Sequence, residues 1–92
     1  MKYLDWDEDK NKKLKEQRGI SFEEVVLAIS EDRILDIIEH PNPKAYPNQK
    51  LFIVNIEDYA YLVPFVEDTE KVFLKTIIPS RKATKKYIIE GK

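Results

Sequence analysis

The sequence predicts a two-layer α+β fold, with N-terminal helices packed on an antiparallel β-meander and a C-terminal helix over an edge or end of the sheet. Three observations predict it. A capping box near residue 21 opens an amphipathic helical pattern, three strand-like segments with short turns fill residues 51–78, and a basic segment follows a proline at position 79. The 92 residues suit one domain, residues 1–92, with a modest core, which excludes a large multi-layer enzyme.

The N-terminal region alternates polar and apolar residues over Lys2–Trp6, which predicts a short strand. Asp7 is a good N-cap for a helix that runs to Arg18, because acidic residues follow it in the first turn. Gly19 suits the left-handed position that ends such a helix.

A second helix begins after Ser21, which forms a capping box with Glu24. Apolar residues then recur at the helical spacing i, i+3, i+4 and i+7, namely Phe22, Val25, Val26 and Ile29. This pattern predicts an amphipathic helix of about three turns that ends near Glu31.

Strand patterns account for most of the remaining chain. The expected strands are Ile34–Glu39, Leu51–Ile56, Tyr59–Val66 and Val72–Ile78. Short connections join the last three, so we expect them to form the meander. Pro64 falls inside one of these strands and predicts a bulge or a frayed ladder near it, because proline cannot donate a ladder hydrogen bond.

The formal net charge of −1 hides a segregation of charge along the chain. Cations gather near the N-terminus and again near the C-terminus, and the segment between them is acidic. The two basic blocks are Lys10, Lys12, Lys13, Lys15 and Arg18, and Lys71, Lys75, Arg81, Lys82, Lys85, Lys86 and Lys92. If they meet in space, they form a basic face that attracts a polyanion. The alternative is two solvated helix faces that never meet.

Composition also restricts the compartment and the chemistry. The chain has no cysteine, no apolar run long enough to cross a membrane and no signal-peptide pattern, so we expect a soluble cytoplasmic protein. It has one histidine, no metal-ligand spacing and no glycine-rich phosphate loop. We therefore expect neither a metal nor a cofactor.

Basic and aromatic side chains remain as the candidates for chemistry. Cleavage of RNA by its own 2′-hydroxyl needs no metal, but it needs a proton acceptor, cations around the phosphorane and an acid for the leaving 5′-oxygen. The candidate catalytic residues are His40, Tyr46, Lys75 and Arg81.

Each candidate also has a simpler structural interpretation. His40 opens the proline-rich loop His40–Gln49, and it either acts on substrate or only packs the loop. Tyr46 either stacks a base or pins that loop to the sheet. Lys75 shares a strand face with Phe73 and Ile77, opposite to Val72, Leu74 and Ile78, and either reaches solvent or points into a cleft.

The C-terminal segment has the clearest pattern for binding phosphate. Ser80 is a good N-cap, and Arg81, Lys82, Lys85 and Lys86 follow in the first two turns, where the helix dipole favours anions. Cations at that end suit a bound phosphate better than they suit the stability of the helix. The alternative is a solvated C-terminal helix with ordinary surface lysines.

Both ends of the chain resemble the BrnT family of type II toxin–antitoxin toxins. At the N-terminus the resemblance rests on Trp6-Asp7-Glu8-Asp9-Lys10-Asn11 and Arg18-Gly19-Ile20-Ser21-Phe22-Glu23-Glu24-Val25. At the C-terminus it rests on Ile77-Ile78-Pro79-Ser80-Arg81-Lys82-Ala83-Thr84. The middle departs from the family pattern, because the proline-rich His40–Gln49 loop replaces a glycine-rich or charged one.

The resemblance implies a RelE-like α+β fold and a ribonuclease that inhibits translation. It also implies neutralisation by an antitoxin with a ribbon-helix-helix DNA-binding domain, through which the pair reaches operator DNA. RNA, including mRNA on the ribosome, is the implied substrate. On this interpretation Arg81 and Lys75 hold the scissile phosphate, and the RNA-binding residues are Lys10, Lys13, Arg18, Lys82, Lys85 and Lys86. The alternative is a non-catalytic module that binds RNA or protein.

Overall fold

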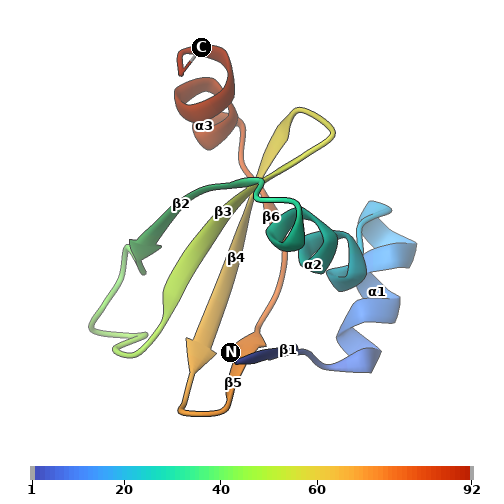
Figure 1. The fold of residues 1–92 in the computed structure, drawn as a ribbon, viewed down its shortest axis with the longest axis vertical. Coiled ribbons are helices and arrows are strands. Elements are labelled where there is room, and N and C mark those ends of the chain that lie inside the picture. Colours follow the sequence, from blue (N-terminus) through green and yellow to red (C-terminus); the bar gives the residue numbers. More distant parts are fainter. Residues whose placement is uncertain (1, 92) are drawn as a thin grey trace.

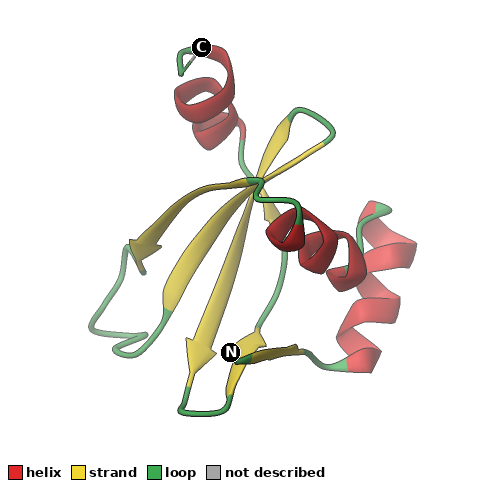
Figure 2. Ribbon diagram, in the orientation of Figure 1, coloured by secondary structure: helices red, strands yellow, loops and turns green. Residues whose placement is uncertain are grey.

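The computed structural model describes residues 2–91, which form a mixed β-sheet with helices on both of its faces (Figure 1). The elements in chain order are β1 (Tyr3–Asp5), α1 (Glu8–Arg18), α2 (Phe22–Ser30), β2 (Ile34–Glu39), β3 (Lys50–Ile56), β4 (Tyr59–Glu67), β5 (Lys71–Leu74), β6 (Ile78–Pro79), α3 (Arg81–Ala83) and the π-helical segment η1 (Thr84–Ile89). Figure 2 distinguishes the helices from the strands by colour. The predicted α+β class is confirmed. No helix within residues 2–91 has the length and apolar content to cross a membrane.

The caps of the two N-terminal helices are as predicted. Asp7 accepts hydrogen bonds from the backbone of α1, and Gly19 ends this helix with φ at 66°. Ser21 and Glu24 form the reciprocal capping box of α2. These local signals therefore determine where both helices begin and where α1 ends.

The sheet has the strand order β1-β5-β4-β3-β2, and β6 pairs with the free part of β4. Strands β2 to β5 are antiparallel neighbours, as the meander prediction requires. However, β1 lies parallel to β5, with Tyr3 opposite Lys71. The sheet is therefore mixed, whereas the prediction was an antiparallel meander. Local alternation identified β1 as a strand, but it does not encode a partner so far along the chain.

Pro64 interrupts the sheet on only one side of β4. The ladder with β3 is continuous, and Leu51 lies opposite Pro64. On the other side β5 pairs as far as Phe65, and β6 resumes at Leu62. The Pro64 carbonyl faces this second side, where it accepts a hydrogen bond from the Lys75 N–H at 2.8 Å. The predicted frayed ladder near Pro64 is confirmed there, because the proline nitrogen points the same way and has no proton to donate.

The predicted strand Val72–Ile78 is consequently split into β5 and β6. Residues 75–77 lie opposite residues 63–64, so the edge strand holds one extra residue, which reverses its alternation. Ile77 therefore points into the core and is fully buried, while Ile78 is 40% exposed. The prediction that Ile77 shares the face of Lys75 was wrong for this reason.

The two faces of the sheet have separate cores. We call the one under the N-terminal helices the α1–α2 face, and its core contains Leu14, Phe22, Val25, Phe52, Val54, Val63, Phe65, Leu74 and Ile77. We call the other the C-terminal face, and its smaller core joins Ile53 and Ala60 to Ala83 and Ile88. The C-terminal helix, residues 81–89, packs on this face near the end of the sheet at Ala60, whereas the prediction placed it over an edge or end. The sheet therefore lies between two helical layers, whereas the prediction had one.

The C-terminal helix is held to β4 by polar contacts as well as by its apolar side chains. Ser80 caps it by accepting from the Ala83 N–H, as predicted. The buried hydroxyl of Thr84 donates to the Ser80 carbonyl at 2.7 Å and accepts from the Ala60 N–H at 2.9 Å. After one α-helical turn the helix becomes π-helical, which the sequence pattern did not predict. Threonine hydroxyls that bond the preceding turn often bend helices.

Candidate functional site

A groove of about 270 Å³ lies between the C-terminal helix and the C-terminal face of the sheet. Three strands provide its apolar floor and the helix provides its polar wall. The lining residues are Ile38, Pro41, Leu51, Ile53, Leu62, Ser80, Lys82, Ala83, Lys86 and Tyr87. The groove therefore joins an apolar surface to ammonium groups that can bind an anion.

The cations of this wall differ in their surroundings. Lys82 is exposed and lines the groove directly. Lys86 also lines it, and its ammonium group lies 5.1 Å from the centre of the Tyr87 ring. Arg81 is exposed in the first turn, beside the lining residues Ser80 and Lys82. Lys85 forms an ion pair with Glu90 at 3.9 Å, which partly balances its charge.

A tyrosine–carboxylate pair closes one side of the groove and was not predicted. The Tyr87 hydroxyl donates to an Asp36 carboxylate oxygen at 2.7 Å, and the other oxygen accepts from the Ile37 backbone N–H at 2.8 Å. The Tyr87 hydrogen bond is the main cause that lowers the pKa of Asp36, and the same bond raises the pKa of Tyr87. An ionised Asp36 and a neutral Tyr87 therefore join β2 to the C-terminal helix. The signal in the sequence was a lone acid within an apolar strand pattern.

His40 and Tyr46 lie together beside the groove. Their ring centres are 4.3 Å apart. His40 follows β2, and the alternation of that strand places it on the same face as Asp36 and Ile38, one residue before the lining residue Pro41. Tyr46 is 44% exposed despite this contact. The ring contact supports both the loop-packing and the stacking interpretation.

The hydrogen bonding of His40 restricts what its imidazole can do. Its Nδ1 accepts from the Asn42 backbone N–H at 3.0 Å. A neutral imidazole with Nδ1 occupied as an acceptor carries its proton on Nε2. In this geometry His40 can donate a hydrogen bond from Nε2, but it cannot take a proton there.

Lys75 lies on the same face but outside the groove. It follows β5, is exposed, and its ammonium group is 5.6 Å from the centre of the Phe73 ring. The structure therefore does not bring Lys75 together with the Ser80–Lys86 segment in one groove.

The N-terminal cations belong to another layer. Lys10 and Lys13 are exposed on α1, which packs on the α1–α2 face, whereas the groove lies on the C-terminal face. Figure 1 shows α1 and α2 together, apart from α3. Arg18 donates to the Ile77 carbonyl at 2.6 Å and so ties the end of α1 to the segment between β5 and β6. The two basic blocks do not form one basic face, because the sheet separates them.

Several other residues of the N-terminal motif have structural roles. Asn11 is 1% exposed, accepts from the Phe22 backbone N–H at 2.8 Å and donates to a Glu23 carboxylate oxygen at 2.8 Å. This bond is the main cause that lowers the pKa of Glu23. Trp6 stacks on Phe22 with ring centres 5.8 Å apart. Asn11 and Trp6 therefore orient α1 and α2, far from the groove.

The chemistry open to the groove is that of cations and hydrogen-bond donors. Within residues 2–91, no three His, Cys, Asp or Glu side chains gather closely enough to hold a metal ion. The groove offers the ammonium groups of Lys82 and Lys86. Arg81 and His40 do not line it, but each is adjacent in the sequence to a residue that does, Lys82 and Pro41 respectively. Such groups stabilise charge on a phosphate or phosphorane.

A family model matches residues 6–86, and it describes a ribonuclease toxin, BrnT, of a type II toxin–antitoxin system. No curated protein matches the chain, and no solved structure does.

Proposed function

Because the chain belongs to the BrnT family of ribonuclease toxins of type II toxin–antitoxin systems, we propose that it cuts mRNA in the groove beside its C-terminal helix. The observation that carries this proposal is the position of Lys82 and Lys86 along an apolar floor, with the exposed Arg81 preceding Lys82 in the first turn of the helix. Apolar floors suit bases and sugars, and the cations suit the phosphates between them.

In the proposed reaction the RNA supplies its own nucleophile. The 2′-hydroxyl loses its proton to solvent water as its oxygen attacks the adjacent phosphorus. The bond to the 5′-oxygen breaks and that oxygen takes a proton from water, so the products are a 2′,3′-cyclic phosphate and a free 5′-hydroxyl. Arg81 and Lys82 stabilise the negative charge that develops on the phosphoryl oxygens. The chemistry needs no metal, because side-chain cations supply the charge that a metal would supply elsewhere.

The proposed roles of the loop residues follow from their geometry. His40 donates a hydrogen bond from Nε2 to the leaving 5′-oxygen, since its Nδ1 is already occupied by the Asn42 N–H. Tyr46, exposed beside the imidazole, stacks on a base next to the scissile bond. Lys86 binds a flanking phosphate.

In the cell, this activity inhibits translation by destroying mRNA in the cytoplasm. Family membership implies an RNA substrate and an antitoxin partner. We further propose that the antitoxin carries a ribbon-helix-helix domain and takes the pair to operator DNA. The resemblance at both ends of the chain supports this part of the proposal.

The test is induction of the protein in bacteria, followed by mapping of new RNA 5′ ends. We expect growth arrest and new 5′-hydroxyl ends, which also form when the purified protein is mixed with RNA in the presence of a metal chelator. Arg81→Ala should restore growth, since removing one charge-stabilising donor costs about 10²-fold in rate.

Lys12→Ala serves as the control, because it removes an exposed cation from α1 on the far side of the sheet. Intact RNA and normal growth after induction of the wild-type protein would contradict the enzymatic proposal. RNA binding without new ends would instead support a non-catalytic module.

A further inference from the structure

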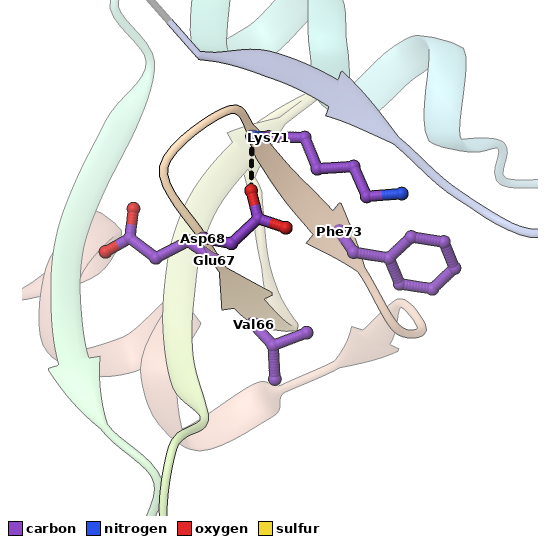
Figure 3. Close-up of a pocket in the computed structure, with 5 residues that line it drawn as sticks. All are labelled: Val66, Glu67, Asp68, Lys71 and Phe73. Carbon is purple, nitrogen blue, oxygen red and sulfur yellow. Dashed lines mark hydrogen bonds between the residues drawn. The ribbon is translucent and has the colours of Figure 1, made fainter.

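A second hollow lies on the C-terminal face, at the end of the sheet away from the C-terminal helix. It encloses about 390 Å³ and is lined by Val66, Glu67, Asp68, Lys71 and Phe73 (Figure 3). Phe73 is only half-buried, although it sits in a strand whose neighbours Val72 and Leu74 are buried. An aromatic ring therefore faces an open hollow that the proposed reaction does not use.

Two cations flank this ring. The Lys71 ammonium group lies 5.7 Å from the centre of the Phe73 ring, and that of Lys75 lies 5.6 Å from it. The three residues alternate along one strand and its extension, so they share one face of the sheet. Lys71 and Phe73 leave β5 on the same side in Figure 3.

The two acidic side chains at the hollow already have partners within the protein. Glu67 lies opposite Val72, which places it on the other face, and it pairs with Lys2 at 2.9 Å. Asp68 accepts from the backbone N–H groups of Glu70 and Lys71 at 2.8 and 2.9 Å, so its carboxylate is turned into the loop.

One of the two cations beside the Phe73 ring has no ion-pair partner among the described residues. Lys71 forms an ion pair with Asp5 at 3.4 Å, whereas none of the ion pairs within residues 2–91 involves Lys75. A negatively charged ligand that reaches Phe73 therefore meets at least one free ammonium group.

The hollow and the groove lie along the same strand, β4. Leu62 lines the groove and Val66 lines the hollow, and both lie on β4. Four residues of a strand span about 13 Å. Tyr3, 57% exposed, is paired with Lys71 and so adds a second aromatic side chain to this face. A single strand of RNA that fills the groove has a path along β4 to Phe73.

We propose that Phe73 is a stacking site for a nucleobase of single-stranded RNA, with Lys75 and Lys71 at the flanking phosphates. This inference rests on the proposed function, because it extends the RNA that the groove binds. Alternating aromatic and basic side chains are how proteins bind single strands with little sequence preference. The site adds affinity for long RNA and takes no part in the chemical step.

The test measures binding of a single-stranded 2′-O-methyl RNA of roughly 12 nucleotides, a length that one such face can cover and that the protein cannot cleave. Phe73→Leu should weaken binding by about 5- to 150-fold, the usual loss of one base–aromatic stack. Phe73→Trp should bind as tightly as wild type, with its fluorescence quenched by the RNA. Lys75→Gln should lower the salt dependence of log K by about 0.7.

Matched controls come from the other face. Tyr59→Leu removes a half-buried aromatic side chain that lies opposite the core residue Ile56, and Lys12→Gln removes an exposed cation of α1. Both should bind the RNA like wild type. Circular dichroism of each variant identifies any that fail to fold, and Phe73→Trp then still tests the site through its fluorescence.

The stacking proposal would be overturned if folded Phe73→Leu bound the RNA like wild type, or if Tyr59→Leu weakened binding equally. A loss of antitoxin binding with unchanged RNA binding would also overturn it, in favour of a protein contact. The proposed function fails separately: if wild type bound the RNA through Phe73 but cut no natural RNA, stacking would stand and ribonuclease activity would not.

Discussion

The two faces of the sheet differ in what their side chains do. On the α1–α2 face, side chains from α1, α2 and strands β3, β4 and β5 form one closed core, and Phe22, Val25, Val54, Val63 and Leu74 are fully buried. On the C-terminal face a short helix covers only part of the sheet, and two hollows flanked by cations remain open. One face is therefore fully covered, and the other leaves side chains exposed where the proposed RNA binds.

The largest effect should come from the closed core. Phe22→Ala should lower the free energy of unfolding by about 3–5 kcal/mol, because a fully buried aromatic side chain leaves a cavity. Ile88→Ala, on the buried side of the C-terminal helix, should lower the free energy of unfolding by about 2 kcal/mol, since this smaller core can adjust. Urea unfolding measures both, and equal losses at the two sites would contradict the comparison.

A smaller loss is expected from the polar bond inside the closed core. Asn11→Ala should cost about 2 kcal/mol, because it leaves the buried Phe22 N–H without an acceptor. The pKa of Glu23 is lowered mainly by Asn11, so this part of the stability is present above the unfolded pKa of about 4.3 and is lost as pH falls through the lower folded value. The difference from wild type should therefore shrink below about pH 4. The neighbouring variant Lys12→Ala should show neither effect.

On the C-terminal face, the Asp36–Tyr87 hydrogen bond should likewise make stability depend on pH. The lowered pKa of Asp36 stabilises the fold above about pH 3.9, and this contribution is lost as pH falls through the folded pKa. The raised pKa of Tyr87 stabilises it below about pH 10, and this contribution is lost as pH rises through the folded pKa. Tyr87→Phe should therefore lower the thermal midpoint at neutral pH and approach wild type at both extremes.

Asp36→Ala is the matched partner in a double-mutant cycle, because alanine offers no acceptor to the Tyr87 hydroxyl. Both single variants break the same hydrogen bond, so the double variant should lower the midpoint by less than the sum of the two. Strict additivity would mean that the two side chains do not interact in solution.

The smallest effect on stability should come from the groove cations. Lys82→Gln should change the free energy of unfolding by less than about 0.5 kcal/mol, because its exposed side chain supports no other residue. It should still lower the salt dependence of single-stranded RNA binding by about 0.7. A large loss of stability would mean that Lys82 holds the helix in place.

The sequence predicted those features that depend on interactions between neighbouring residues. The caps at Asp7, Gly19 and Ser21 were correct, because each depends on bonds within a few residues. The parallel pairing of β1 was not predictable in this way, since it depends on strands that meet only after the chain has folded back. The extra residue after Leu74 was not predictable either, because a bulge exists only relative to the partner strand, here β4.

The candidate site was predicted in part for the same reason. The Ser80–Lys86 segment carries its chemistry in consecutive residues, and the structure places it along a groove. Tyr87 was missed because its hydrogen bond is made with Asp36, which lies far away in the sequence. Lys10 and Lys13 were grouped with this site by charge alone, and the sheet lies between them and the groove.

Proposed cleavage on the C-terminal face can be distinguished from cleavage on the α1–α2 face by one kinetic experiment. The rate of cleavage of a fluorescent single-stranded RNA is compared, in the presence of a chelator, for Arg81→Ala and for the double variant Lys10→Gln/Lys13→Gln. We predict a loss of about 10²-fold in kcat/KM for Arg81→Ala and a rate close to wild type for the α1 variant. Full activity of Arg81→Ala together with an inactive α1 variant would instead place cleavage on the α1–α2 face.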